Sequence, residues 1–135
     1  MKKIICITIL IMLFIAGVMI MIGQNNLQER NETTIRYVSM DEITKIMEEN
    51  KNYIILDVRT IEEFNQGHIP DAICIPNETI DNSVINKLPD KNQLILIYCR
   101  SGNRSKQATE KLKNLGYTNL IEFGGIIDWK GEIIK

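Results

Sequence analysis

A cysteine at the start of a polar, arginine-containing loop is the part of this sequence best suited to do chemistry. Cys99 directly follows the apolar residues 94–98, which predict a buried strand, and residues 105–115 predict a helix that ends at Gly116. A cysteine between a strand and a helix lies where open α/β sheets bind ligands. Loop N–H groups and the helix N-terminus favour an anion there, and they also favour the thiolate form of a cysteine.

Cys99 is therefore a candidate nucleophile, although most free cysteines are buried structural residues. The two arginines of the loop add positive charge, and a guanidinium group can grip an anion through paired N–H groups. The loop glycine allows the chain to close with its N–H groups turned inward, and the other polar residues are expected to bind through backbone N–H groups. The candidate substrate-binding residues are Arg100, Ser101, Gly102, Asn103, Arg104 and Ser105.

Strand and helix signals alternate on both sides of this loop. Apolar runs predict strands at residues 35–38, 53–58, 72–75, 94–98 and 120–123. Capping signals predict helices at residues 39–49, 60–67 and 105–115, whereas residues 80–88 are helical or irregular. This order predicts a three-layer α/β domain with a mainly parallel sheet.

Several further motifs lie outside the cysteine loop. They are Asp57-Val58-Arg59, Glu63-Phe64, Gly67-His68-Ile69-Pro70, Ala72-Ile73-Cys74-Ile75-Pro76 and Gly124-Gly125-Ile126-Ile127-Asp128-Trp129. Together with the Cys99 loop they cover most of residues 35–129, and in this order they resemble the single-domain rhodanese sulfurtransferases. The resemblance implies a rhodanese-like domain with a mainly parallel, five-stranded sheet. Asp71 stands where a glycine is common in that family.

The same resemblance implies a reaction. Cys99 would take a sulfane sulfur from a small anionic donor such as thiosulfate, or from a persulfide, and hold it as a persulfide until a thiol or cyanide acceptor removes it. Asp57 and Arg59 would support the site, although a purely structural ion pair is the simpler interpretation of these two residues. His68 is expected to be structural.

Two other functions stay open at this point. Phosphatases and arsenate reductases on a similar fold have a Cys-x5-Arg loop, whereas Arg104 lies at Cys-x4-Arg spacing and Ser105 takes the phosphatase position. The shorter loop makes a smaller cradle, which suits a sulfur atom better than a phosphoryl group. The other alternative is a persulfide carrier or docking module that does not turn over thiosulfate.

The composition narrows the possible cofactors and partners. The chain has 16 Lys and Arg residues against 17 Asp and Glu residues, a formal net charge of −1, so we expect no nucleic-acid partner. Its three cysteines form no CxxC pair and it has one histidine, so we expect no metal and no cofactor. Recognition of an anion must therefore be local to the loop.

The first 23 residues differ in character from the rest of the chain. Lys2 and Lys3 precede an uncharged, largely apolar run over residues 4–22, which is close to the length of a membrane-spanning helix. We expect residues 1–23 to be an uncleaved signal anchor or, alternatively, a cleaved signal peptide of a secreted protein. Residues 24–34 are interpreted as a linker and residues 35–135 as the domain. The positive-inside rule predicts a single-pass protein of the cell membrane with an extracytoplasmic domain.

Overall fold

The computed structural model describes residues 1, 7, 10–18 and 33–135. The chain divides into two compact units, Met1–Glu32 and Thr33–Lys135. Residues 10–18 of the first unit are helical. Within the described residues, no helix is both long enough and apolar enough to cross a membrane. The anchor or signal peptide predicted over residues 1–23 and the linker predicted over residues 24–34 lie partly outside the described residues.

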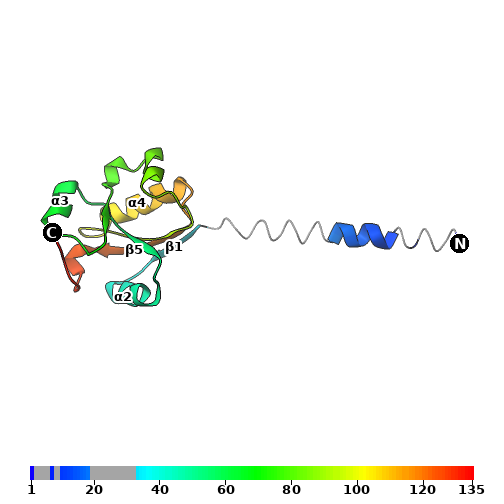
Figure 1. Cartoon of the computed structure of the whole chain (residues 1–135), viewed down its shortest axis with the longest axis horizontal. Helices are drawn as coiled ribbons and strands as arrows, with labels where there is room; N and C mark the ends of the chain where they lie inside the picture. The colour runs from blue at the N-terminus through cyan, green and yellow to red at the C-terminus, as the bar shows by residue number, and fades with distance from the viewer. Residues whose placement is uncertain (2–6, 8–9, 19–32) are drawn as a thin grey trace. The chain divides into compact units, whose positions relative to one another are not determined.

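The second unit is a sheet with helices on both faces (Figure 1). The strands are β1 (Thr34–Tyr37), β2 (Tyr53–Asp57), β3 (Ile73–Cys74), β4 (Leu94–Cys99) and β5 (Asn119–Gly125). The helices are α2 (Met40–Glu49), α3 (Ile61–Gln66) and α4 (Asn103–Asn114), with short 3-10 helices η1 (Asn77–Thr79), η2 (Asn82–Asn86) and η3 (Ile126–Asp128). The strand order is β1-β5-β4-β2-β3, and all neighbouring strands are parallel. The predicted α/β fold with a parallel, five-stranded sheet is confirmed.

The central strand β4 separates two halves of the core. Its residues Ile97 and Cys99 belong to the cluster that includes α4, whereas Leu96 and Tyr98 belong to the cluster that includes α2. Because both faces of β4 are covered, nearly every side chain in it is buried and its sequence is continuously apolar. The Cys99 side chain therefore lies on the α4 face of the sheet.

Local signals explain where the helices begin. Thr60 and Glu63 form the predicted capping box at the start of α3, each accepting a hydrogen bond from the other's backbone N–H. Helix α4 begins at Asn103, two residues before the predicted start, because Gly102 adopts a φ of 98° and turns the chain directly from the loop into the helix. Asp71, which stands where a glycine is common, has a φ of 63°. This is the left-handed region of the backbone, which glycine adopts freely and aspartate tolerates.

Candidate active site

The candidate nucleophile lies in a tight turn between β4 and α4. Cys99 is 1% exposed, and the Gly102 N–H donates a hydrogen bond to its Sγ over 3.0 Å. The Ser105 Oγ lies 3.5 Å from the same sulfur. Polar groups at the start of α4 therefore surround the sulfur atom, as expected for a site that stabilises a negative charge.

The surroundings of Cys99 favour its ionised form. Burial alone raises the pKa of the Cys99 thiol, because a charge is poorly solvated inside the protein. The side-chain hydrogen bond with Ser105 and the hydrogen bonds from the backbone N–H groups of Ser105, Gly102 and Ser101 act in the opposite direction, and the net effect lowers the pKa below its ordinary value. This arrangement can hold a thiolate, or a sulfur anion attached to it.

The carboxyl end of β5 supports the loop from below. A Cβ atom placed on Gly125 would lie 2.1 Å from the Arg100 carbonyl oxygen, so no larger residue fits there without moving the loop. The Ile127 N–H donates a hydrogen bond to the same carbonyl over 3.3 Å. A glycine at position 125 is therefore needed for the close approach of β5 and the Cys99 loop.

A buried carboxylate, which the sequence analysis did not identify, lies next to this loop. Glu122 is 3% exposed, and its Oε1 accepts hydrogen bonds from the Ser105 hydroxyl and, over 3.0 Å, from the Gly124 N–H. Ser105 is itself fully buried. The sequence holds one sign of this carboxylate, because Glu122 is the single charged residue in the apolar run of residues 120–123. A carboxylate at a buried strand position needs hydrogen-bond donors close to it.

The two loop arginines differ in what they contact. Arg104 forms a two-pronged ion pair with Glu63 of α3, with N–O distances of 2.7 and 2.9 Å. This ion pair and the backbone hydrogen bond from Thr60 hold the pKa of Glu63 at about 2, although burial opposes the shift. Arg100, by contrast, is exposed at the loop surface, as are Ser101 and Asn103.

Asp57 and Arg59 form a buried pair at the end of β2. The Arg59 Nη2 lies 2.6 Å from Asp57 Oδ2 and donates a second hydrogen bond to the Gly67 carbonyl oxygen over 2.7 Å. The pair thereby ties the end of β2 to the segment that follows α3. Asp57 is the register partner of Tyr98, the residue before Cys99, so the pair lies one strand away from the nucleophile.

His68 and Cys74 make other contacts. The His68 ring stacks on Phe64 with centroids 3.7 Å apart, and its Nδ1 lies 2.9 Å from the Phe64 carbonyl oxygen. Cys74, at the end of β3, lies 3.6 Å from the Arg59 carbonyl oxygen. Burial, followed by the nearby Asp57 carboxylate, raises the pKa of the Cys74 thiol to about 11.

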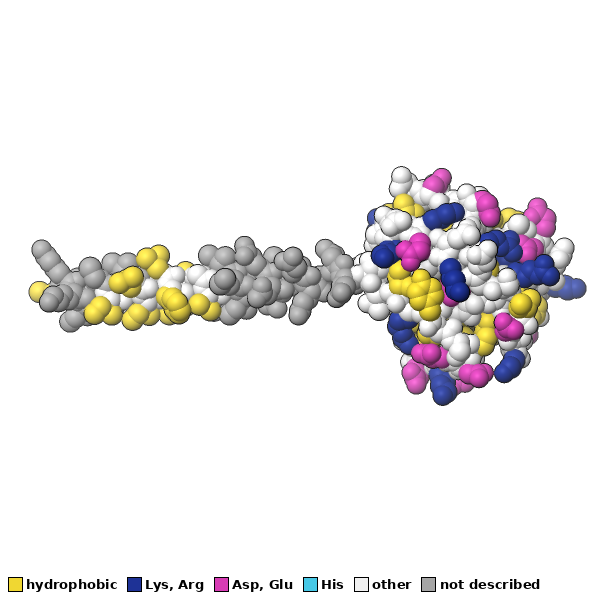
Figure 2. Space-filling model, turned by 180° about the vertical axis from the view of Figure 1, so that it is seen from behind, with side chains coloured by type: hydrophobic (Ala, Val, Ile, Leu, Met, Phe, Trp, Pro, Cys, Tyr) yellow, Lys and Arg dark blue, Asp and Glu magenta, His cyan; other side chains and the backbone are white. Residues whose placement is uncertain are grey.

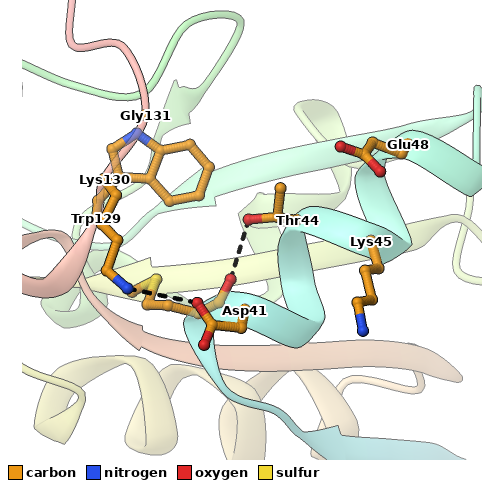
Figure 3. Close-up of a pocket in the computed structure, with 8 residues that line it drawn as sticks. Asp41, Thr44, Lys45, Glu48, Trp129, Lys130 and Gly131 are labelled. Atoms are coloured by element: carbon orange, nitrogen blue, oxygen red, sulfur yellow. Dashed lines mark hydrogen bonds and ion pairs between the residues drawn. The ribbon is translucent and has the colours of Figure 1, made fainter.

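A surface hollow lies away from this loop. It has a volume of about 510 Å³ and lies between α2 and residues 129–131, where Lys130 forms an ion pair with Asp41 over 3.5 Å (Figure 3). None of the loop residues 99–105 lines it. Elsewhere on the visible face of the second unit, Lys and Arg side chains are mixed with Asp and Glu side chains (Figure 2).

Comparison with known proteins gives a consistent result. The family model of the rhodanese-like domain matches residues 39–132. The chain is 38% identical over 73 residues to thiosulfate sulfurtransferase PspE of Escherichia coli (strain K12), an alignment that covers 54% of this chain and 70% of PspE. It is 33% identical over 103 residues to putative sulfur carrier protein YrkF of Bacillus subtilis (strain 168), covering 76% of this chain and 55% of YrkF.

A solved structure, described as rhodanese with anions from E. coli, is also similar. It aligns with a TM-score of 0.57 and 35% sequence identity, over 62% of this chain and 98% of that chain. The strand-loop-helix arrangement around Cys99 and the match over residues 39–132 agree. The chain therefore belongs to the rhodanese-like domain family.

Proposed function

We propose that this protein is a sulfurtransferase that carries sulfur as a persulfide on Cys99. The Cys99 thiolate attacks the outer sulfur of thiosulfate, forms a bond to it, and releases sulfite with the electron pair of the broken sulfur–sulfur bond. A thiolate or cyanide acceptor then attacks the outer sulfur of the persulfide and regenerates the Cys99 thiolate. Both steps conserve charge and need no oxidant or reductant.

The observation that carries this proposal is the ring of hydrogen-bond donors around the Cys99 sulfur. The Gly102 N–H lies 3.0 Å from Sγ, and N–H groups of Ser101 and Ser105 also favour the thiolate. A persulfide places its negative charge one atom further out, so the same loop can stabilise the intermediate.

The loop also supports an anionic donor. Arg100 is the exposed cation of the loop, whereas Arg104 is held by Glu63. We assign first contact with thiosulfate to Arg100 and to the loop N–H groups, and we assign Arg104 to positioning the loop against α3. The E. coli structure described with anions is similar over 62% of this chain.

Thiocyanate formation from thiosulfate and cyanide tests the proposal. The full-length protein should produce thiocyanate, Cys99→Ser should produce none, and Cys74→Ser should keep the activity. If the protein and Cys99→Ser are equally inactive, the donor is not thiosulfate. If Cys99→Ser retains activity, the assignment of the nucleophile is wrong.

The second candidate is a persulfide carrier that exchanges sulfur with another protein. The resemblance to a protein named as a putative sulfur carrier supports it. Mass spectrometry after incubation with a persulfide donor distinguishes the two. A carrier gains one sulfur atom on Cys99 without releasing thiocyanate.

For the cellular location, we propose a membrane-attached domain outside the cytoplasm. The two lysines at the N-terminus and the uncharged residues 4–22 support this proposal. Protease added to intact cells should digest the domain, and a protected domain would rule out this orientation. Recovery of the domain from the culture medium would instead indicate cleavage after a signal peptide.

A further inference from the structure

The ion pair between Glu63 and Arg104 occupies one of the two arginines of the cysteine loop. We propose that Glu63 selects the sulfur donor by charge: it keeps Arg104 from binding an oxyanion, and so disfavours a doubly charged donor such as thiosulfate relative to an organic persulfide. The inference rests on the proposed function, in which Cys99 takes up the sulfur, and it adds the class of donor that suits the site.

Arg104 has the position and the geometry to bind an oxyanion. It lies in the first turn of α4, close to the Cys99 loop. The hydrogen bonds to Glu63 raise the pKa of Arg104, burial opposes this shift, and the nearby Cys99 sulfur adds to it, so the guanidinium group lies within electrostatic reach of the sulfur. A guanidinium group can bind an oxyanion through two parallel N–H groups, but here both of them are used by a carboxylate of the protein itself.

Glu63 is fixed in this place by the start of its own helix. Its Oε2 accepts a hydrogen bond from the Thr60 N–H over 3.0 Å, and its own N–H donates to the Thr60 hydroxyl over 3.2 Å. The side chains of the ion pair are only 25% exposed for Arg104 and 29% exposed for Glu63. A donor that needs Arg104 must therefore break a two-pronged, partly shielded ion pair before it can bind.

The charges that remain around the loop favour a donor with little charge. Arg100 is exposed and forms no ion pair with any residue that the structure describes. Arg104, by contrast, is opposed by Glu63 and also by the Glu78 carboxylate of η1, which adds to the rise in its pKa. One free cation therefore serves both the Cys99 thiolate and the incoming donor. Thiosulfate brings two negative charges to this point, whereas the sulfur atoms of a persulfide carry one or none.

Sulfur transfer from a persulfide balances without an oxyanion. The Cys99 thiolate forms a bond to the outer, protonated sulfur of the donor as the sulfur–sulfur bond of the donor breaks. The donor leaves as a thiolate with the electron pair of that bond, and the proton stays on the transferred sulfur. The net charge does not change, and no oxidant or reductant is needed.

Protection of Cys99 from iodoacetamide by sulfate tests the inference without any sulfur transfer. Sulfate is an unreactive, doubly charged oxyanion, sodium chloride keeps the ionic strength constant, and each protein is compared with its own rate without sulfate. Glu63→Gln keeps an oxygen acceptor for the cap but holds Arg104 less tightly. Half protection should therefore need about tenfold less sulfate than in the unmodified protein. If sulfate protects neither protein, or both equally, the proposal is overturned.

Two matched variants separate the release of Arg104 from a change in net charge. Glu62→Gln removes the neighbouring, exposed carboxylate of α3, which forms no ion pair in the described part of the chain. It should change the sulfate requirement by about twofold or less. Glu63→Gln combined with Arg104→Gln should lose the gain of the single variant. An equal gain in Glu62→Gln, or a gain that survives in the double variant, would overturn the proposal.

The donor preference of the unmodified protein provides a test that needs no variant. With cyanide as the acceptor, and with the rate without protein subtracted, the KM for thiosulfate should exceed the KM for an alkyl persulfide by about tenfold or more. Glu63→Gln should lower the KM for thiosulfate alone. A KM for thiosulfate at or below that for the persulfide would contradict the inference. If sulfate protection follows the expected pattern but neither donor yields thiocyanate, only the proposed function fails.

Discussion

Cys74 and Cys99 lie at the carboxyl ends of strands in the same sheet, yet the pKa values of their thiols are shifted in opposite directions. Cys99 is the more deeply buried of the two, at 1% exposure, and its pKa is lowered despite that burial. Cys74 is only partly buried, and burial together with the Asp57 carboxylate raises the pKa of its thiol to about 11.

The two sulfurs also face different backbone groups. Cys99 faces N–H groups of a turn and a helix N-terminus, including the Gly102 N–H at 3.0 Å. Cys74 faces carbonyl oxygens, at 3.6 Å from Arg59 and 4.0 Å from Thr60. At Cys99 the hydrogen-bond donors therefore outweigh the effect of burial on the pKa, whereas at Cys74 burial and the Asp57 carboxylate act in the same direction.

The largest effect is expected from Gly125→Ala, which should make Cys99 no more reactive than Cys74. Because the added Cβ would meet the Arg100 carbonyl oxygen at 2.1 Å, the loop must move, and its N–H groups then no longer point at the sulfur. Alkylation of Cys99 at pH 7 and thiocyanate formation should fall by roughly 100-fold or more.

Gly124→Ala is the matched control for that experiment. Gly124 has a φ of 91° but open space around its Cβ position, so the change adds backbone strain without a clash. It should lower the melting temperature and leave most of the reactivity of Cys99. Equal losses in both variants would show that the loop responds to general strain.

A second measurement compares the two thiols directly. At pH 7, iodoacetamide should modify Cys99 roughly 100 times faster than Cys74, because the thiolate fraction differs by orders of magnitude. Isotope-coded alkylation with peptide mass spectrometry gives both rates in one sample. Similar rates would mean that access, and not thiolate character, controls the reactivity of these cysteines.

The ion pair between Glu63 and Arg104 should make a smaller contribution, on stability. The pKa of Glu63 in the folded protein is about 2, below its ordinary value. The stabilisation is therefore present above about pH 4.5 and is lost as the pH falls toward 2. Glu63→Gln keeps an oxygen acceptor for the cap. It should lower the free energy of unfolding by roughly 1–2 kcal/mol at pH 7 after allowing for solvent screening.

Urea denaturation of both proteins across this pH range gives the test. The free energy of unfolding of the unmodified protein should exceed that of Glu63→Gln at pH 7, and this difference should shrink to zero as the pH falls toward 2. A difference that does not depend on pH would show that the glutamate acts through packing rather than charge.

The smallest effect is expected on the Cys74 side of the sheet. Asp71 precedes β3 with a φ of 63°, and Asp71→Gly should relieve this conformation and stabilise the protein by about 1 kcal/mol or less. Thermal unfolding measures the gain. The alkylation profile of Cys99 should not change, and a change would show that the two ends of the sheet are coupled.

Local signals were sufficient for the elements that bear the site. The capping box of Thr60 and Glu63, the burial of β4 and the place of Cys99 at its end all follow from residues close together in the sequence. Contacts between distant residues did not follow. Glu63 and Arg104 are 41 residues apart, and Ser105 and Glu122 are 17 apart.

The sequence by itself determined an α/β domain with a cysteine between a strand and a helix, because hydrophobic periodicity and turn residues act over a few positions. Only the tertiary structure decided what surrounds each sulfur. Parallel register places Glu122 of β5 beside β4, and the packing of α4 brings Ser105 between them. Such neighbours depend on strand order and helix packing, and no local pattern encodes either one.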